Sequence, residues 1–228
     1  MADGMTADWL KRLYYGVLRP PMWLNGRLYA ALRQPRTPLK VHLGPGKGKY
    51  VPGWLNVDGN IVSARLDLWA DLRDRLPFRD NSVATIYSFH VIEHLPDRVL
   101  PRHFADMFRV LQPGGAIRIG GPDIGNACKK YLENDHAWFS DFPDRRDSIG
   151  GRFANFVFCR GEHLTALSES YLRELAQNAG FVDIERRLPC RDSGVVGREI
   201  LDTEYESDFE TPHSVVIEAR KPSSRHAS

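Results

Sequence analysis

Short apolar runs alternate with amphipathic segments along most of the chain. Apolar residues at helical spacing predict a helix over residues 98–111, which Pro113-Gly114 ends, and a second over residues 168–178, which Gly180 ends. Runs of strand-forming residues predict seven strands, over residues 39–43, 54–58, 65–69, 83–88, 116–119, 181–187 and 214–220. This alternation predicts an α/β fold with a mostly parallel sheet covered on both faces. The last two strands have no clear helix between them, so we expect them to pair antiparallel at an edge.

The first 38 residues differ from the rest and are expected to form a basic, amphipathic helical arm. Helical spacing of apolar residues predicts one helix that Arg19-Pro20-Pro21 stops and a second short helix after it. Residues 1–40 carry a net charge of +5, against −3 for the remainder. Basic and aromatic side chains together suit a membrane interface, whereas a lid or dimer helix packed on the domain is the favoured interpretation. The apolar positions are Trp9, Leu10, Leu13, Tyr14, Val17, Leu18, Leu24, Leu28, Ala31 and Leu32.

Composition narrows the class of protein. The 228 residues are 42% hydrophobic with a net charge of +2, which excludes wholesale disorder and argues against a nucleic-acid partner. No apolar run reaches the roughly 18 residues of a membrane span, and no secretory leader is expected. Cys128, Cys159 and Cys190 are far apart, so they predict neither a disulfide framework nor a zinc site, and a cytoplasmic protein is expected.

A glycine-rich loop follows the first predicted strand. Residues 44–48 read Gly-Pro-Gly-Lys-Gly, at the carboxyl end of a strand where open α/β sheets bind ligands. Asp58 ends the next strand, where a carboxylate can accept two hydrogen bonds from a ribose diol, although both features also suit ordinary turns. Only residues 44–53 separate the two strands, too few for a full crossover helix, so backbone amides of the loop would have to bind the ligand.

Taken in order, the motifs resemble class I S-adenosylmethionine-dependent methyltransferases, over residues 39–221. The resemblance is closest to a small bacterial branch, and it depends on the order and spacing of the motifs rather than on any one of them. Pro45 departs from the cysteine usual at that position, but the tight turn is kept. The motifs are Leu43-Gly44-Pro45-Gly46, Gly53-Trp54-Leu55-Asn56-Val57-Asp58, Asp71-Leu72, Leu76-Pro77-Phe78, Ser82, His90-Val91-Ile92-Glu93-His94-Leu95, Leu111-Gln112-Pro113-Gly114-Gly115 and Ala179-Gly180-Phe181.

The resemblance implies a Rossmann-like seven-stranded sheet and S-adenosylmethionine as the cofactor. By it, Asp58 would bind the ribose hydroxyls, and Asp71 with the Leu72 backbone would meet the adenine. Phe89 and His90 would flank the sulfonium and the amino-acid part. The loop residues Gly44, Pro45, Gly46 and Gly48 would line the methionine end.

The histidines around Glu93 allow two interpretations. Residues 90–94 read H-x-x-E-H, an inverted zinc-protease signature, but the motif directly follows a strand and Pro96 cuts the helix short. We therefore expect no metal. Methyl transfer to an alcohol or amine needs a proton removed, and the candidate bases are His90, Asp123 and His163. For Asp123 and His163, turn chemistry and the start of a helix are the structural alternatives.

The segment 124–165 is interpreted as an acceptor-side insertion, and residues 222–228 as a polar tail. The aromatic and arginine residues of the insertion could cover a sugar or an anionic acceptor, or form a satellite core, and a helix is expected within the insertion.

The leading hypothesis is methyl transfer to a small-molecule or glycan acceptor, at oxygen. The alternative is a binding module that kept the fold and lost the chemistry, suggested by the short first crossover. Peripheral membrane contact or dimerisation through residues 1–38 remains open.

Overall fold

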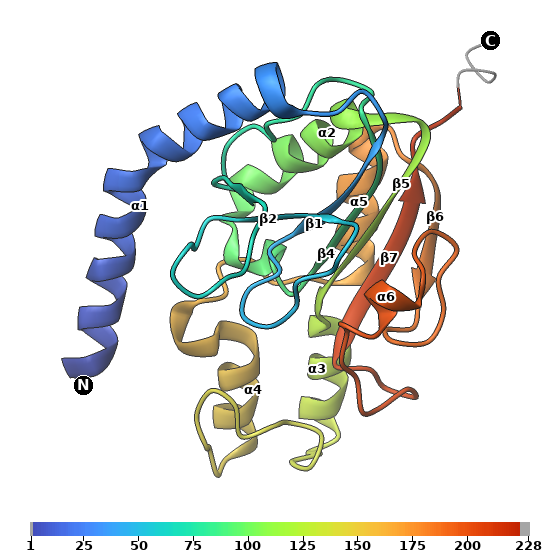
Figure 1. The fold of residues 1–228 in the computed structure, drawn as a ribbon. Helices are drawn as coiled ribbons and strands as arrows, with labels where there is room; N and C mark the ends of the chain where they lie inside the picture. The colour runs from blue at the N-terminus through green and yellow to red at the C-terminus, as the bar shows by residue number, and fades with distance from the viewer. Residues whose placement is uncertain (1, 224–228) are drawn as a thin grey trace.

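The computed structural model describes the backbone of residues 2–223 and the side chains of residues 13–223. One seven-stranded sheet runs through the molecule in the order β3-β2-β1-β4-β5-β7-β6, as predicted (Figure 1). All neighbours are parallel except β5–β7 and β7–β6, so the antiparallel edge is confirmed. The strands are β1 Leu39–Leu43, β2 Leu55–Asp58, β3 Leu68–Trp69, β4 Val83–Phe89, β5 Leu111–Pro122, β6 Val182–Arg187 and β7 Ser214–Arg220.

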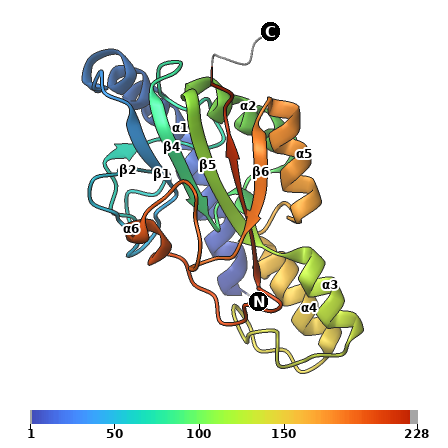
Figure 2. The same cartoon turned by 90° about the vertical axis from the view of Figure 1, so that its right-hand side faces the viewer.

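Helices α2 (Leu100–Val110) and α5 (Glu169–Ala179) lie on one face of the sheet, and the short helix α6 (Arg198–Leu201) lies on the other (Figure 2). The alternation along β4 explains both layers. Ile86 joins the main core beneath α2 and α5, whereas Tyr87 and Phe89 point to the opposite side. Both faces of the central strands are therefore buried, as a mostly parallel sheet requires.

The connection from β1 to β2 contains no helix, as its length predicted. Val51 and Trp54 of this connection pack with Tyr87, Phe89 and Ile200 into a second, smaller core. The long connection between β6 and β7, which includes α6, thereby covers the face that a crossover helix would normally cover.

Helix α1 (Ala2–Leu28) contradicts the predicted break at Arg19-Pro20-Pro21, because both prolines lie inside one continuous helix. Its axis bends, which is the usual consequence of proline in a helix (Figure 1). Contacts on both sides of the prolines hold it: an ion pair between Arg19 and Asp74 and the fully buried Met22. Tertiary packing thus outweighs the two backbone hydrogen bonds that proline removes.

The arm lies against the domain, which favours the packed-helix interpretation. Tyr14 Oη donates to the Gly59 carbonyl at 3.0 Å, and Asn25 Nδ2 donates to the Trp69 carbonyl at 2.9 Å. The side chains of Trp9, Leu10, Lys11 and Arg12 lie outside the described residues, as does most of the predicted tail. In the part that the structure describes, no helix combines the length and apolarity that crossing a membrane requires.

Some predicted boundaries shift. The helix over residues 98–111 divides into a 3₁₀ turn, Asp97–Val99, and α2, while β5 begins at Leu111 rather than at residue 116. The insertion holds two helices, α3 (Ile124–Leu132) and α4 (Ile149–Phe158), where at least one was expected. The third strand is only Leu68–Trp69.

Candidate active site

The glycine loop after β1 has the left-handed backbone that only glycine adopts cheaply. Gly44, Gly46 and Gly48 have φ of +67°, +53° and +84°. A Cβ on Gly44 would come within 2.9 Å of Val91 Cγ1 and closer still to Cγ2, so this glycine permits close packing against the segment after β4. A Cβ on Gly46 or Gly48 would meet no atom within 4 Å. The loop is therefore fixed at its start and open beyond it.

Asp58 lies at the end of β2 and faces this loop. Its Oδ2 accepts the Gly46 backbone N–H at 3.1 Å, and its Oδ1 accepts the Asn60 N–H at 2.8 Å. The side chain is only half-buried, so the lone pairs that remain on each oxygen can accept further hydrogen bonds. This geometry brings the predicted ribose ligand and the predicted glycine loop together.

Asp71, after β3, is differently placed because Arg73 engages its carboxylate. Arg73 Nε lies 2.9 Å and 3.1 Å from the two oxygens, and the Arg73 backbone N–H also donates to Oδ1. The Tyr15 ring of α1 lies 4.4 Å from the Arg73 guanidinium and packs against Gly59. Burial, followed by Asp58 and Asp71, raises the pKa of Tyr15 to about 12. Sequence reasoning missed Tyr15 because it treated the arm as separate from the site.

Phe89 ends β4, the central strand of the sheet, and His90 follows it directly. His90 is forced into the left-handed region, with φ of +56°, while its N–H still donates to the Gly120 carbonyl at 2.9 Å. Such strain in a residue other than glycine is common at functional sites. The ring is held on two sides, with Nε2 2.9 Å from Ser214 Oγ and Nδ1 3.3 Å from Glu93 Oε1.

The Tyr205 ring covers His90 and the Lys49 ammonium lies over that ring, and no sequence motif indicated either residue. The Tyr205 ring stacks on the His90 ring with centroids 5.1 Å apart, and the Lys49 ammonium lies 4.5 Å from the Tyr205 centroid. Burial lowers the pKa of Lys49 and raises that of Tyr205 to about 12. Lys49 comes from the glycine loop and Tyr205 from the connection before β7, so only the fold brings them together.

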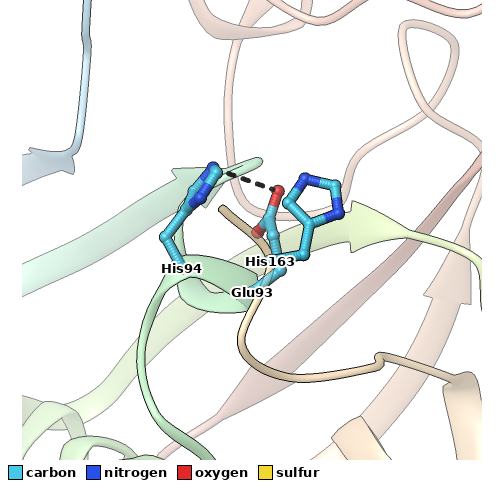
Figure 3. A group of neighbouring side chains, drawn as sticks. All are labelled: Glu93, His94 and His163. Carbon is cyan, nitrogen blue, oxygen red and sulfur yellow. Dashed lines mark ion pairs between the residues drawn. The ribbon is translucent and has the colours of Figure 1, made fainter. Parts of the chain in front are cut away.

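Glu93, His94 and His163 form a cluster beside His90 (Figure 3). Glu93 and His94 belong to a single 3₁₀ turn, Ile92–His94, so the long helix of a zinc protease is absent here. His163 arrives from the insertion because the Glu93 carbonyl accepts the backbone N–H groups of Leu164 and Thr165. The predicted candidates His90 and His163 therefore lie on either side of one buried carboxylate.

Asp123, the third candidate base, has a structural position. Its Oδ1 accepts the Asn126 N–H and caps α3, and its Oδ2 pairs with Arg186 Nη2 at 2.9 Å. Burial raises the pKa of Asp123 above its ordinary value. Both oxygens are engaged, which matches the turn alternative named for this residue.

Most aromatics of the insertion form a satellite core. Trp138 and Phe139 are buried with Ala127, and Phe153 and Phe156 pack against them. A cavity of about 690 Å³ lies instead between α1 and residues 70–80; none of the glycine loop, Asp58 or His90 lines it. The cavity thus borders Asp71 without containing the residues that meet at the ends of β1, β2 and β4.

Comparison with known proteins indicates which class of protein has this fold and site. A methyltransferase domain model matches residues 57–119, which span β2 through most of β5. No curated protein matches the sequence. Residues 57–119 therefore match a methyltransferase domain, within a sheet that has the strand order typical of S-adenosylmethionine-dependent methyltransferases.

Solved structures agree with the fold. An S-adenosylmethionine-dependent methyltransferase from Archaeoglobus fulgidus is 16% identical with a TM-score of 0.52, covering 91% of this chain and 100% of its own. A possible histamine N-methyltransferase from Thermotoga maritima is 17% identical with a TM-score of 0.51, covering 96% and 97%. Phosphoethanolamine N-methyltransferase 2 of Haemonchus contortus, in complex with S-adenosyl-L-methionine, is 16% identical with a TM-score of 0.51; the match covers 87% of this chain and 52% of that one.

Proposed function

We propose that the protein transfers the methyl group of S-adenosylmethionine to an oxygen atom of a small-molecule or glycan acceptor. The observation that carries this proposal is the meeting of Asp58, the open glycine loop and the strained His90 at adjacent strand ends. The cofactor supplies a methyl group already activated by the sulfonium, so alignment of donor and acceptor is the main requirement.

The described residues fit this cofactor. The half-buried Asp58 carboxylate keeps lone pairs for the ribose hydroxyls, and the loop is open at Gly46 and Gly48, where backbone can approach the methionine part. Pro45 lacks an N–H and the Gly46 N–H already donates to Asp58, so Gly48 and its neighbours supply the loop donors. Asp71 is engaged by Arg73, so the adenine would meet this ion pair and the Leu72 backbone rather than a free carboxylate.

We assign to His90 the role of the base that removes the proton from the acceptor. Oxygen acceptors must lose a proton as the methyl group arrives, and His90 presents an imidazole between the Glu93 carboxylate and the Ser214 hydroxyl. In the tautomer that carries its hydrogen on Nδ1, Nε2 has the lone pair for that proton, and it faces Ser214 Oγ at 2.9 Å. Phe89 packs beside it with ring centroids 4.5 Å apart, which restricts the ring.

Calorimetric titration with S-adenosylmethionine tests the cofactor site. Asp58→Ala should weaken binding about 10- to 100-fold, since hydrogen bonds to a charged group contribute about 1.5–3 kcal/mol. Asp147→Ala, at a side chain that is 97% exposed, is the matched control and should bind like the wild type. Equal affinity in both variants would show that Asp58 is not the ribose ligand.

Transfer of a labelled methyl group to alcohol, phenol, sugar and amine acceptors tests which acceptor atom receives the methyl group. We expect label in ethers from at least one hydroxyl class, and its loss in His90→Ala at a cofactor concentration that saturates the variant. Label on nitrogen or carbon alone contradicts the proposal. Cofactor binding without any turnover across these classes would support the binding-module alternative instead.

A further inference from the structure

Glu93 is a buried carboxylate without the hydrogen bonds that such a group needs. Its side chain is 1% exposed, and neither Oε1 nor Oε2 has a hydrogen-bond partner among the described residues. The His90 contact of 3.3 Å is too poorly oriented to count as a full hydrogen bond. Within the described residues its ion-pair partners are two histidines, His90 and His94, and neither is a permanent cation. A buried anion in this state needs a compensating positive charge.

The two imidazoles beside Glu93 have their tautomers fixed by backbone carbonyls. His94 Nδ1 lies 2.9 Å from the Glu162 carbonyl, and His163 Nδ1 lies 3.1 Å from the Val157 carbonyl. A carbonyl can only accept, so both Nδ1 atoms carry the hydrogen and both Nε2 atoms keep a free lone pair. An N–H donated to a carbonyl is the arrangement that orients histidines bound to metal ions.

The three donors converge (Figure 3). One ligand atom each from Glu93, His94 and His163 all lie within 4.8 Å of one another. Ligands of a tetrahedral zinc ion are about 3.3 Å apart for bonds of about 2.0–2.1 Å, so binding requires a small inward movement. The His94 side chain is 40% exposed, so solvent leaves room for this movement.

We propose that Glu93, His94 and His163 bind a divalent transition-metal ion of the zinc class. Two imidazole nitrogens and one carboxylate oxygen are a donor set that suits such ions, and three protein ligands leave a coordination position open. The His90 side chain adjoins the same carboxylate. If the proposed function holds, the open position suits the acceptor oxygen; metal binding itself does not depend on it.

Metal titration of the full chain tests the site. After stripping with a chelator, the protein is titrated with Zn²⁺ by calorimetry and with Co²⁺ by visible absorption, without cofactor or acceptor. We expect one ion per chain, and at least a 100-fold loss of affinity in His94→Ala and in His163→Ala. His136→Ala, in the insertion, is the matched control and should bind like the wild type.

Two more variants keep the outcome decisive. Glu93→Gln retains the shape of the side chain without its charge and should also lose the ion. Cys159→Ser removes a half-buried thiol whose charge is coupled to Glu93, and it should bind normally. Absence of binding by the wild type, or binding that depends on Cys159 and survives His94→Ala, overturns the proposal. Cofactor titration of the same samples reports separately on the proposed function.

Discussion

Gly44 shows how one residue can connect two parts of the site. Its positive φ shapes the glycine loop, and its missing side chain lets Val91 approach from the segment after β4. Position 44 and position 48 share the left-handed backbone, but position 48 opens onto free space. Substitutions at these two positions therefore separate the free-energy cost of the left-handed backbone from the free-energy cost of the contact with Val91.

Gly44→Ala should destabilise the protein by about 2–5 kcal/mol, since left-handed strain of about 1–2 kcal/mol adds to overpacking of about 1–3 kcal/mol. Gly48→Ala should cost only the strain. Urea unfolding monitored by circular dichroism measures both changes.

Val91→Ala should restore part of the loss in the Gly44→Ala background, because it removes the methyl groups that the new Cβ would meet. Equal costs at positions 44 and 48, or no rescue, would show that the close contact with Val91 is not what excludes a side chain from position 44.

At the residue scale, the sequence predicted what regular patterns encode. The glycine loop, Asp58 and His90 lie at strand ends, so topology alone brings them to one edge. Tyr205, Lys49 and Tyr15 could not be predicted, because they reach the site from segments without a motif. Arg118 was equally invisible: it lies in β5 with its side chain fully buried, held by Glu204 and Glu218, where a charged strand residue normally suggests exposure.

At the scale of elements, α1 is the clearest departure from prediction. Local proline chemistry predicted a break, whereas the domain surface supplies enough contacts to keep one helix. Gly26 lies at the closest approach, where a Cβ would come within 2.7 Å of Pro77 Cβ, while a Cβ on Gly16 of the same helix would meet nothing within 4 Å. A side chain at position 26 would therefore clash with the domain, whereas a side chain at position 16 would point into open space.

Gly26→Ala should destabilise the protein by about 1–2 kcal/mol, because overpacking against the rigid Pro77 ring outweighs the gain in helix propensity. Gly16→Ala should stabilise it by about 0.5–1 kcal/mol, since only the propensity changes. Unfolding in urea gives both values. If both substitutions stabilise, α1 does not pack on Pro77 as described.

At the scale of the whole molecule, the fold buries some titratable side chains completely and leaves others exposed to solvent. The connection before β7 replaces the missing crossover helix and completes the burial of the central strands. Two histidines lie inside the resulting cores, His42 on β1 and His103 on α2. Burial lowers the pKa of each from 6.5 to about 4; the Asn56 side chain partly opposes this at His42, and Asp106 does so at His103.

These two histidines predict a loss of stability in mild acid. Their folded-state pKa lies below the unfolded value, so the unfolded chain binds protons first as the pH falls. The stability they contribute is complete above about pH 6.5 and is lost progressively toward pH 4. Each pKa unit corresponds to about 1.4 kcal/mol, so each histidine accounts for up to about 3 kcal/mol across this window.

His103→Leu isolates one of them, since the His103 Nε2 has no hydrogen-bond partner in the described structure and leucine suits a buried apolar position. Urea unfolding at intervals from pH 8 to pH 4 should show a variant that loses less stability than the wild type below about pH 6.5. The difference between the two proteins should grow as the pH falls toward 4, because carboxylates affect both alike. Parallel curves would mean that His103 takes up its proton as easily in the folded protein as in the unfolded chain, and that the core around α2 admits water.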